Sequence, residues 1–94
     1  MPDPTRGSKW RRSRAICLAR SNICHLCGEP IDLALSGRHP WGPVVDHIVS
    51  LYDGGAMHDQ ANLAPAHRRC NIIKENRLRH VRRHKPRLNT TQQW

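Results

Sequence analysis

The sequence HRRCNIIK at residues 67–74, taken with CHLC at residues 24–27, decides how this chain folds. Each segment places two metal-binding side chains with two residues between them, and such spacing lets one turn hold one cation. The candidate ligands are Cys24, Cys27, His67 and Cys70. Two pairs from separated segments predict a closed, tetrahedral structural zinc site. Zinc binding would then tie the two halves of the chain together and contribute to folding.

The composition indicates that the fold needs an added cross-link such as a zinc site. The chain has 94 residues, of which 37% are hydrophobic, with no Phe and one Tyr, so it has room for one domain and a small core. A disulfide framework in a secreted protein is the alternative use of four cysteines, but no apolar secretory segment is evident. Cys17 has no spaced partner and is predicted to be a small buried residue. His25, between two ligands, is predicted to be solvated.

The charge is high and uneven. The net charge is +9, and basic residues crowd positions 6–14 and 68–87, whereas most carboxylates lie between residues 24 and 59. Basic flanks around a less basic centre suit a nucleic-acid backbone held on both sides of a site, although a solubilising surface is the alternative. No segment approaches the length of a membrane span, so we expect a cytoplasmic protein without a membrane partner.

Local signals divide the chain into a few elements. Pro65 suits the first turn of the last helix and Pro86 its end, whereas Ser8 could cap the first helix. Glycines and prolines make residues 30–43 irregular. The predicted order is a loose arm at 1–7, a helix at 8–21, a metal-binding turn at 24–28, a strand at 44–46, a loop at 50–60, a strand at 61–64 antiparallel to the first, a helix at 66–84 and a polar tail at 87–94. The domain would span residues 8–86.

A second set of polar residues lies between the two zinc pairs and just after the second pair. Asp46 offers a hard oxygen ligand for Mg²⁺ or a similar cation, and the adjacent His47 could take a proton from water. Strand neighbours point to opposite faces, so both can serve one site only if the strand ends or bends there. Asn71 follows the last zinc ligand, and Lys74 shares its helix face. In a strongly basic chain, this set indicates a nuclease.

These motifs together resemble the HNH endonuclease family. The motifs that carry the resemblance are Cys24-x-x-Cys27-Gly28, Asp46-His47-Ile48-Val49, Gly54-Gly55, Asn62-Leu63, His67-x-x-Cys70-Asn71 and Lys74. Each is weak alone, but six in the correct order are highly specific. Residues 10–28 also resemble the lead-in helix of small phage-type members, so the resemblance covers residues 10–77.

The resemblance implies an α+β fold of the ββα-metal (His-Me finger) type, with an added N-terminal helix and a Cys3His zinc site. It implies that Asp46 and Asn71 ligate a catalytic cation, that His47 is the general base, and that Asn62, in the second strand, bonds across the loop and orients His47. The substrate would be DNA. The residues expected to contact nucleic acid are Lys74, Arg77, Arg68 and Arg69.

The chain departs from the family pattern at two positions. Many members have histidine where this chain has Asn71, and the harder amide oxygen should favour Mg²⁺ or Mn²⁺ over softer metals. Glu75 stands where a glycine is frequent. It could lie near the phosphate path and weaken binding, or pair with Arg79 one turn later.

The predicted activity is metal-assisted hydrolysis of DNA phosphodiester bonds. One site per monomer predicts nicking, and the lack of a base-reading module predicts low sequence specificity. We expect a monomer or weak dimer. Three alternatives remain open: a zinc-containing DNA-binding module without catalysis, a subunit that acts beside a phage DNA-packaging or processing partner such as a terminase, and a toxin-like nuclease.

Overall fold

The structure is a computed structural model that describes residues 7–84. Its elements are α1 (Ser8–Arg20), β1 (Pro43–His47), the 3-10 turns η2 (Leu51–Asp53) and η3 (Gln60–Asn62), β2 (Leu63–His67) and α2 (Arg68–His84). This arrangement confirms the predicted α+β class, with two helices and an antiparallel pair of strands. The predicted tail, Pro86 and all of the predicted arm except Gly7 lie outside the described residues.

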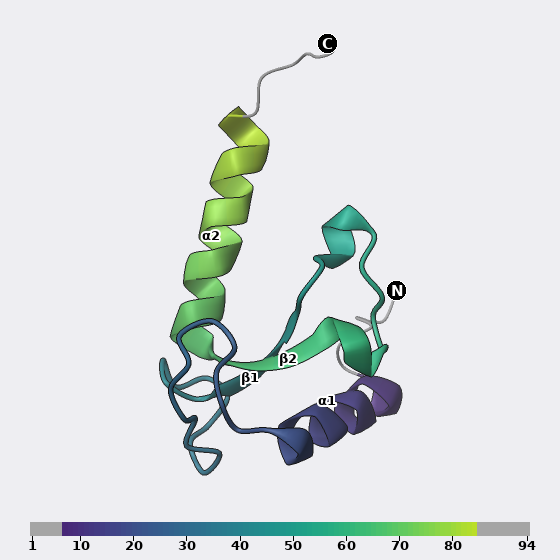
Figure 1. The fold of residues 1–94 in the computed structure, drawn as a ribbon, viewed down its shortest axis with the longest axis vertical. Coiled ribbons are helices and arrows are strands. Elements are labelled where there is room, and N and C mark those ends of the chain that lie inside the picture. Colours follow the sequence, from purple (N-terminus) through teal and green to yellow (C-terminus); the bar gives the residue numbers. More distant parts are fainter. Residues whose placement is uncertain (1–6, 85–94) are drawn as a thin grey trace.

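The strand pair forms the centre of the molecule. β1 runs antiparallel to β2, with Pro43 opposite His67 and His47 opposite Leu63. Figure 1 shows α1 lying across one side of the strands and α2 rising from the end of β2. Because β2 continues directly into α2, the zinc candidate His67 ends a strand while Cys70 stands in the first turn of a helix.

The predicted start of the last helix was wrong. Pro65 lies in the middle of β2, opposite Val45, and β2 begins at Leu63 rather than at residue 61. Proline lacks a backbone N–H but can occupy a strand with a free edge, and in a two-stranded sheet both strands have one. The carbonyl of Pro65 accepts a hydrogen bond from the backbone N–H of His25 at 3.0 Å. The strand therefore extends to His67, and α2 starts two residues later than predicted.

Helix α1 packs through the face that carries Trp10 and Cys17. Both are buried, and they form a small core with Leu63 of β2. Burial of Cys17 confirms that prediction, whereas Ile16 on another face is 45% exposed. Ser8 is the first helical residue rather than the cap; Gly7 occupies the cap position without a side-chain hydrogen bond.

A second core cluster joins the zinc turn to the strands. It contains Cys24, Ile31 and Ala66, with Val44 and Cys70 packed against it. Two of its members are candidate metal ligands, so this half of the core is built around the proposed zinc site. Neither helix in residues 7–84 combines the length and the apolar character needed to cross a membrane.

Candidate functional site

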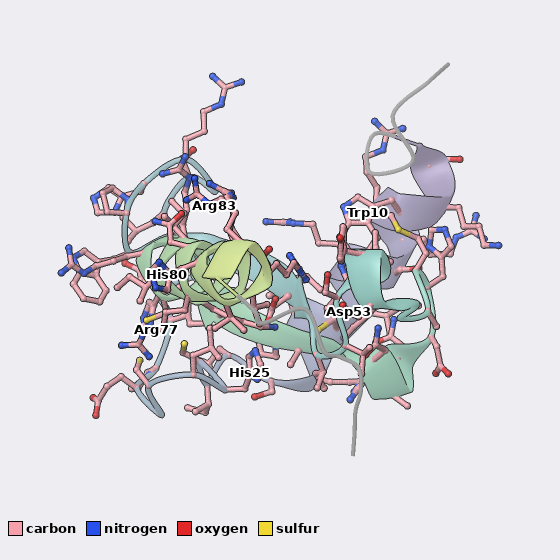
Figure 2. All side chains as sticks on the ribbon, turned by 90° about the horizontal axis from the view of Figure 1, so that it is seen from above. Trp10, His25, Asp53, Arg77, His80 and Arg83 are labelled. Carbon is pink, nitrogen blue, oxygen red and sulfur yellow. The ribbon has the colours of Figure 1, made fainter. Side chains whose placement is uncertain are left out.

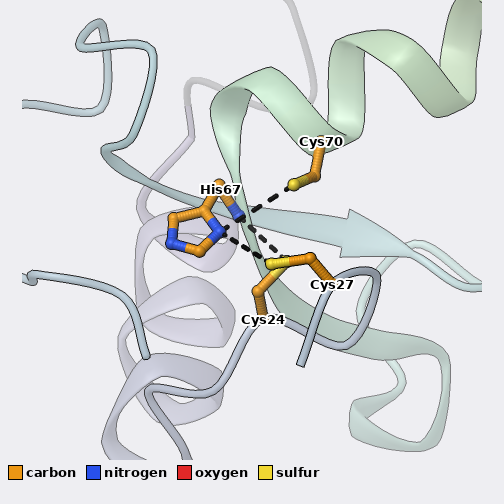
Figure 3. Close-up of side chains that lie close together, drawn as sticks. All are labelled: Cys24, Cys27, His67 and Cys70. Carbon is orange, nitrogen blue, oxygen red and sulfur yellow. Dashed lines mark hydrogen bonds between the residues drawn. The ribbon is translucent and has the colours of Figure 1, made fainter. Parts of the chain in front are cut away.

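The four predicted zinc ligands converge. The ligand atoms of Cys24, Cys27, His67 and Cys70 all lie within 4.8 Å of one another (Figure 3). Nδ1 of His67 is 3.3 Å from Sγ of Cys27 and 3.9 Å from Sγ of Cys70. All three cysteines are free thiols. This donor set and its compactness fit a tetrahedral zinc ion.

Backbone contacts orient these ligands. Nε2 of His67 donates to the carbonyl of Pro30 at 3.1 Å, which fixes the ring so that Nδ1 faces the thiols. In the turn, the N–H of Gly28 donates to the carbonyl of Cys24 at 2.8 Å. Gly28 has φ +80°, a left-handed conformation that glycine adopts without steric cost. The glycine after the second cysteine thus closes the turn that presents both thiols.

The thiols influence each other's ionisation. Burial opposes ionisation of Cys24, but hydrogen bonds from the backbone of His67 and neighbouring residues outweigh it and lower its pKa to about 7. At Cys70, burial and then the hydrogen bonds and negative charge of the other two thiols raise the pKa to about 11. Thiols this close resist ionising together, and a bound cation would remove that conflict.

A separate polar pocket of about 190 Å³ lies where β1 ends against α2. It is lined by Val45, Asp46, His47, Ser50, Leu51, Asn71 and Glu75. The predicted residues Asp46, His47 and Asn71 therefore meet in one place, because β1 ends at His47 and lets both neighbours border the pocket. Glu75 borders the pocket and forms no ion pair with Arg79 among residues 7–84. This favours the prediction that Glu75 lies near the phosphate path over the prediction that it pairs with Arg79.

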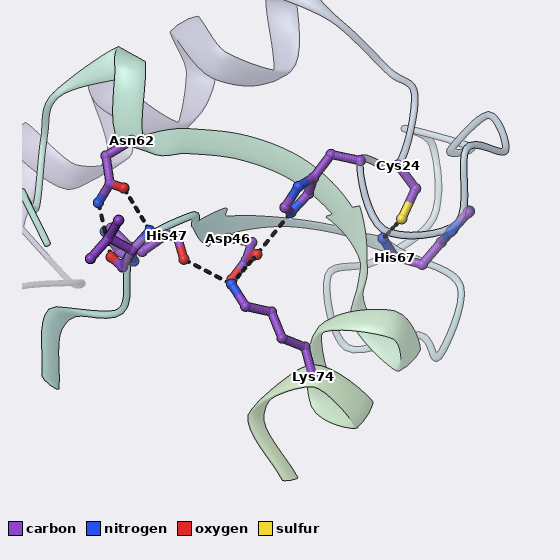
Figure 4. Close-up of polar contacts among 8 residues, drawn as sticks. Cys24, Asp46, His47, Asn62, His67 and Lys74 are labelled. Atoms are coloured by element: carbon purple, nitrogen blue, oxygen red, sulfur yellow. Dashed lines mark hydrogen bonds and ion pairs between the residues drawn. The ribbon is translucent and has the colours of Figure 1, made fainter. Parts of the chain in front are cut away.

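Asp46 is almost completely buried, at 3% exposure. One of its carboxylate oxygens, Oδ2, bonds to two side chains, Lys74 and His25. Lys74 Nζ is 2.7 Å from Oδ2 of Asp46 and also donates to the carbonyl of His47 at 2.9 Å (Figure 4). Nε2 of His25 donates to the same Oδ2 at 2.8 Å. His25 is an exposed residue, as predicted, but its ring also bonds to a buried carboxylate, which the prediction did not include. The bond from the His25 backbone to Pro65 places the zinc turn beside the strands, a tertiary contact that no local pattern indicates.

Two oxygens in the pocket are left for another partner. Within residues 7–84, every side-chain hydrogen bond of Asp46 uses Oδ2. Oδ1 of Asn71 is buried and has no hydrogen-bond partner in the same part of the chain. Buried acceptors are normally satisfied, and a hard divalent cation takes oxygen ligands of these two kinds. The residues present thus fit a catalytic cation.

His47 is held from two sides. Its Nε2 donates to the carbonyl of Met57 at 3.0 Å, and its ring stacks on Trp10 with centroids 5.2 Å apart and planes 23° apart. Trp10 was missed as a site residue; only its place on the same helix face as Cys17 could have indicated that it packs inward. The contact explains how α1 supports the candidate base.

Asn62 spans the loop but does so differently from the prediction. It is the last residue of η3, not part of β2. Its Oδ1 accepts from the N–H of Val49 at 2.7 Å, and its Nδ2 donates to the carbonyls of Val49 and Ala56 at 3.0 and 2.9 Å. Among the described residues the hydrogen-bond partner of the His47 ring is the carbonyl of Met57, next to Ala56. Asn62 therefore braces the loop that carries this carbonyl.

The predicted nucleic-acid contacts are spread over α2. Lys74 and Arg77 both line a separate groove of about 360 Å³ with Leu26 and Cys70. The Lys74 ammonium also contacts Asp46 of the polar pocket. Figure 2, which looks along α2, shows Arg77 on the side away from Trp10 and Asp53. Arg68 is exposed, and Arg69 lies 5.7 Å over the Trp41 ring.

The comparisons with known proteins give one match. A family model described as HNH endonuclease matches residues 24–77, which is more than half of the chain. The matched segment starts at the first candidate zinc ligand and includes every residue of the polar pocket. Searches of curated proteins and of solved structures find no match.

Proposed function

The chain belongs to the HNH endonuclease family, and from this premise we propose that it hydrolyses phosphodiester bonds in DNA with the help of a divalent cation. The observation that carries the proposal is the pocket in which Asp46, His47 and Asn71 meet and in which the buried Oδ1 of Asn71 has no hydrogen-bond partner among residues 7–84. The high positive charge supports a polyanionic substrate.

We propose that Asp46 and Asn71 hold the catalytic cation. Their oxygens are hard ligands, which supports Mg²⁺ or Mn²⁺. A cation held there would stabilise the negative charge that develops on the phosphate and the leaving oxygen. His25 and Lys74 orient the Asp46 carboxylate through Oδ2, and Oδ1 is left for the cation.

His47 is the proposed general base. The hydrogen bond from Nε2 to Met57 places the ring proton on that nitrogen and leaves Nδ1 free to accept a proton from water. Stacking on Trp10 restrains rotation of the ring. Asn62 contributes indirectly, by bracing the loop that carries Met57.

The proposed zinc ion has a structural role. All four of its ligand positions are filled by protein side chains, which leaves none for substrate. It would hold the start of α2 against β2 and so position Asn71 and Lys74 over the pocket.

We further propose low sequence specificity and single-strand nicking, since the chain offers one such pocket per monomer within residues 7–84. Lys74 is proposed to contact the scissile phosphate, and Arg68, Arg69 and Arg77 the flanking backbone. A cytoplasmic site of action in a bacterial host, and stimulation by a phage DNA-packaging or processing partner such as a terminase, are extensions that rest on small size and on the phage-type resemblance of residues 10–28.

The test is cleavage of supercoiled plasmid by purified protein with Mg²⁺, Mn²⁺ or EDTA. We expect metal-dependent conversion to the nicked form, lost in His47→Ala and retained in His39→Ala, which removes an exposed histidine of the preceding loop. Cleavage that survives in His47→Ala would contradict the assigned base. No cleavage by folded, zinc-loaded protein would favour the binding-module or partner-dependent alternatives.

A further inference from the structure

The segment that leaves β1, residues 48–52, presents large apolar side chains to solvent. Ile48 is 50% exposed, Val49 49%, Leu51 42% and Tyr52 77%. We call residues 48–52 the exit loop. Leu51 and Ser50, within the same loop, line the pocket of Asp46 and His47. The apolar side chains of the exit loop therefore adjoin the candidate catalytic site.

Tyr52 is held in place from one side by Arg82 of α2. The guanidinium carbon lies 4.1 Å from the centre of the Tyr52 ring. Nη2 of Arg82 also donates to Oγ of Ser50 at 3.2 Å and lies 3.0 Å from Oδ2 of Asp53. The same Ser50 hydroxyl accepts from the N–H of Tyr52 at 3.1 Å. One arginine thus fixes the loop on both sides of the ring.

This arrangement leaves the second face of the ring open. With one face against the guanidinium and Tyr52 77% exposed, the face away from Arg82 is turned to solvent. A preordered aromatic ring next to a positive charge is the kind of platform on which nucleobases stack, because every base has a flat π-face and a nearby phosphate. A base on the open face of Tyr52 would extend the stack that the Arg82 guanidinium and the Tyr52 ring already form.

We propose that Tyr52 stacks on an unpaired nucleobase beside the scissile phosphate, so that the preferred substrate is DNA with unpaired bases: single strands, mismatches or junctions. This inference rests on the proposed nuclease function. A paired base in a regular duplex has both faces covered by its neighbours, and stacking on Tyr52 would first require it to be unstacked. The exposed Ile48, Val49 and Leu51 would then cover the apolar parts of the opened strand.

The surrounding charge favours nucleic acid over a protein partner on this surface. Arg82 adjoins Tyr52 directly, and exposed Arg79 and Arg83 lie within one turn of it on α2. The carboxylate of Asp53 is paired with Arg82, which reduces its repulsion of a phosphate. An apolar protein surface would gain little from this cluster of cations, whereas a strand of DNA matches both the aromatic ring and the charges.

The experiment measures binding separately from cleavage. Full-length His47→Ala protein, which leaves the oligonucleotide intact, is titrated into single-stranded and duplex oligonucleotides that carry 2-aminopurine. The anisotropy of an end label measures affinity. The fluorescence of 2-aminopurine reports stacking. Adding Tyr52→Leu should weaken single-strand binding roughly 5- to 100-fold and abolish the fluorescence change. Tyr52→Phe keeps the ring and should bind within about twofold of the parent.

The duplex provides the matched comparison, because Tyr52→Leu should change its binding little. Equal loss on both DNAs, or no loss on either, would overturn the inference. So would a change of oligomeric state in Tyr52→Leu by light scattering, since the exit loop would then be a contact between copies. Absence of metal-dependent cleavage in wild-type protein would contradict the nuclease proposal alone, because the stacking result does not depend on cleavage. Thermal unfolding of each variant verifies that it is folded.

Discussion

His25 and Asp46 connect the two candidate metal sites directly: Nε2 of His25 lies 2.8 Å from Oδ2 of Asp46. His25 belongs to the turn that carries two candidate zinc ligands, and Asp46 is the buried carboxylate of the polar pocket. A single side chain therefore transmits the position of the zinc turn to the group proposed to hold the catalytic cation. The carboxylate would be oriented only when the zinc turn is formed.

Replacing His25 should weaken use of the catalytic cation without removing zinc. His25→Ala deletes a hydrogen bond to a buried carboxylate, which should cost on the order of 1–2 kcal/mol of stability. We also expect the Mn²⁺ concentration for half-maximal cleavage to rise several-fold. His25→Gln keeps a donor at similar reach and should recover most of the effect. Zinc content, measured in parallel, should stay at one ion per chain; its loss would mean that the substitution damages the turn instead.

Removal of zinc should unfold the domain. The core cluster of Cys24, Ile31 and Ala66 includes a ligand, and structural zinc supplies folding free energy in domains this small. Treatment with a strong chelator, or Cys70→Ser, should abolish the cooperative thermal transition seen by circular dichroism. Cys17→Ala is the matched control: it removes a buried thiol outside the cluster and should keep the zinc, at a cost of about 1 kcal/mol. A chelated protein with an unchanged transition would refute a structural role for zinc.

Asn62 should tolerate alanine better than aspartate. Its Nδ2 donates to the carbonyls of Val49 and Ala56, so Asn62→Asp would place a carboxylate against two carbonyl oxygens. Asn62→Ala only removes the bonds and lets water reach the loop. At neutral pH the aspartate variant should be less stable than the alanine variant by about 1–3 kcal/mol, measured by urea unfolding. Both should lose cleavage activity. An aspartate variant as stable as wild type would mean that these contacts are not formed.

Gly55 should be intolerant of any side chain. A Cβ atom at this position would overlap the carbonyl oxygen of Val49 and press on Nδ2 of Asn62, so the loop could not close. Gly55→Ala should destabilise the domain by about 1–3 kcal/mol and reduce nicking strongly. Gly54, its neighbour, has φ +87° but open space around it. Gly54→Asn should therefore be nearly neutral, because asparagine adopts this conformation with little strain. Plasmid nicking and thermal unfolding of the two variants give the comparison.

The metal-ligand spacing was the most informative part of the sequence. A tetrahedral site restricts ligand type and separation so strongly that Cys24, Cys27, His67 and Cys70 can be grouped by their spacing alone. The β-branched pair Val44 and Val45 likewise indicated the first strand. Asp46 and His47 could be assigned to one pocket only on condition that the strand ended there, and it does end at His47.

Other features depend on contacts between distant segments. Proline favours the first turn of a helix, yet Pro65 pairs with Val45 in a strand, because tertiary pairing outweighed a weak local preference. The contact of Arg82 with Ser50 joins positions 32 residues apart. In a chain with many arginines, no pattern distinguishes this one from the others. The hydrogen-bond partner of the His47 ring is a backbone carbonyl, and every residue type has one, so no sequence pattern identifies it.

Helix α2 acts as a lever. Its first turn is anchored through Cys70, and Arg82 stands twelve residues later, about 18 Å along the axis. A tilt of about 10° at the anchored end would displace Arg82 by about 3 Å, a distance comparable to the 3.0 Å contact that it makes with Asp53. The stiffness of the proposed zinc site would thus determine whether a contact at the far end of the helix is made or broken. Exchange of zinc for a larger ion would change the alignment of Tyr52 without touching it.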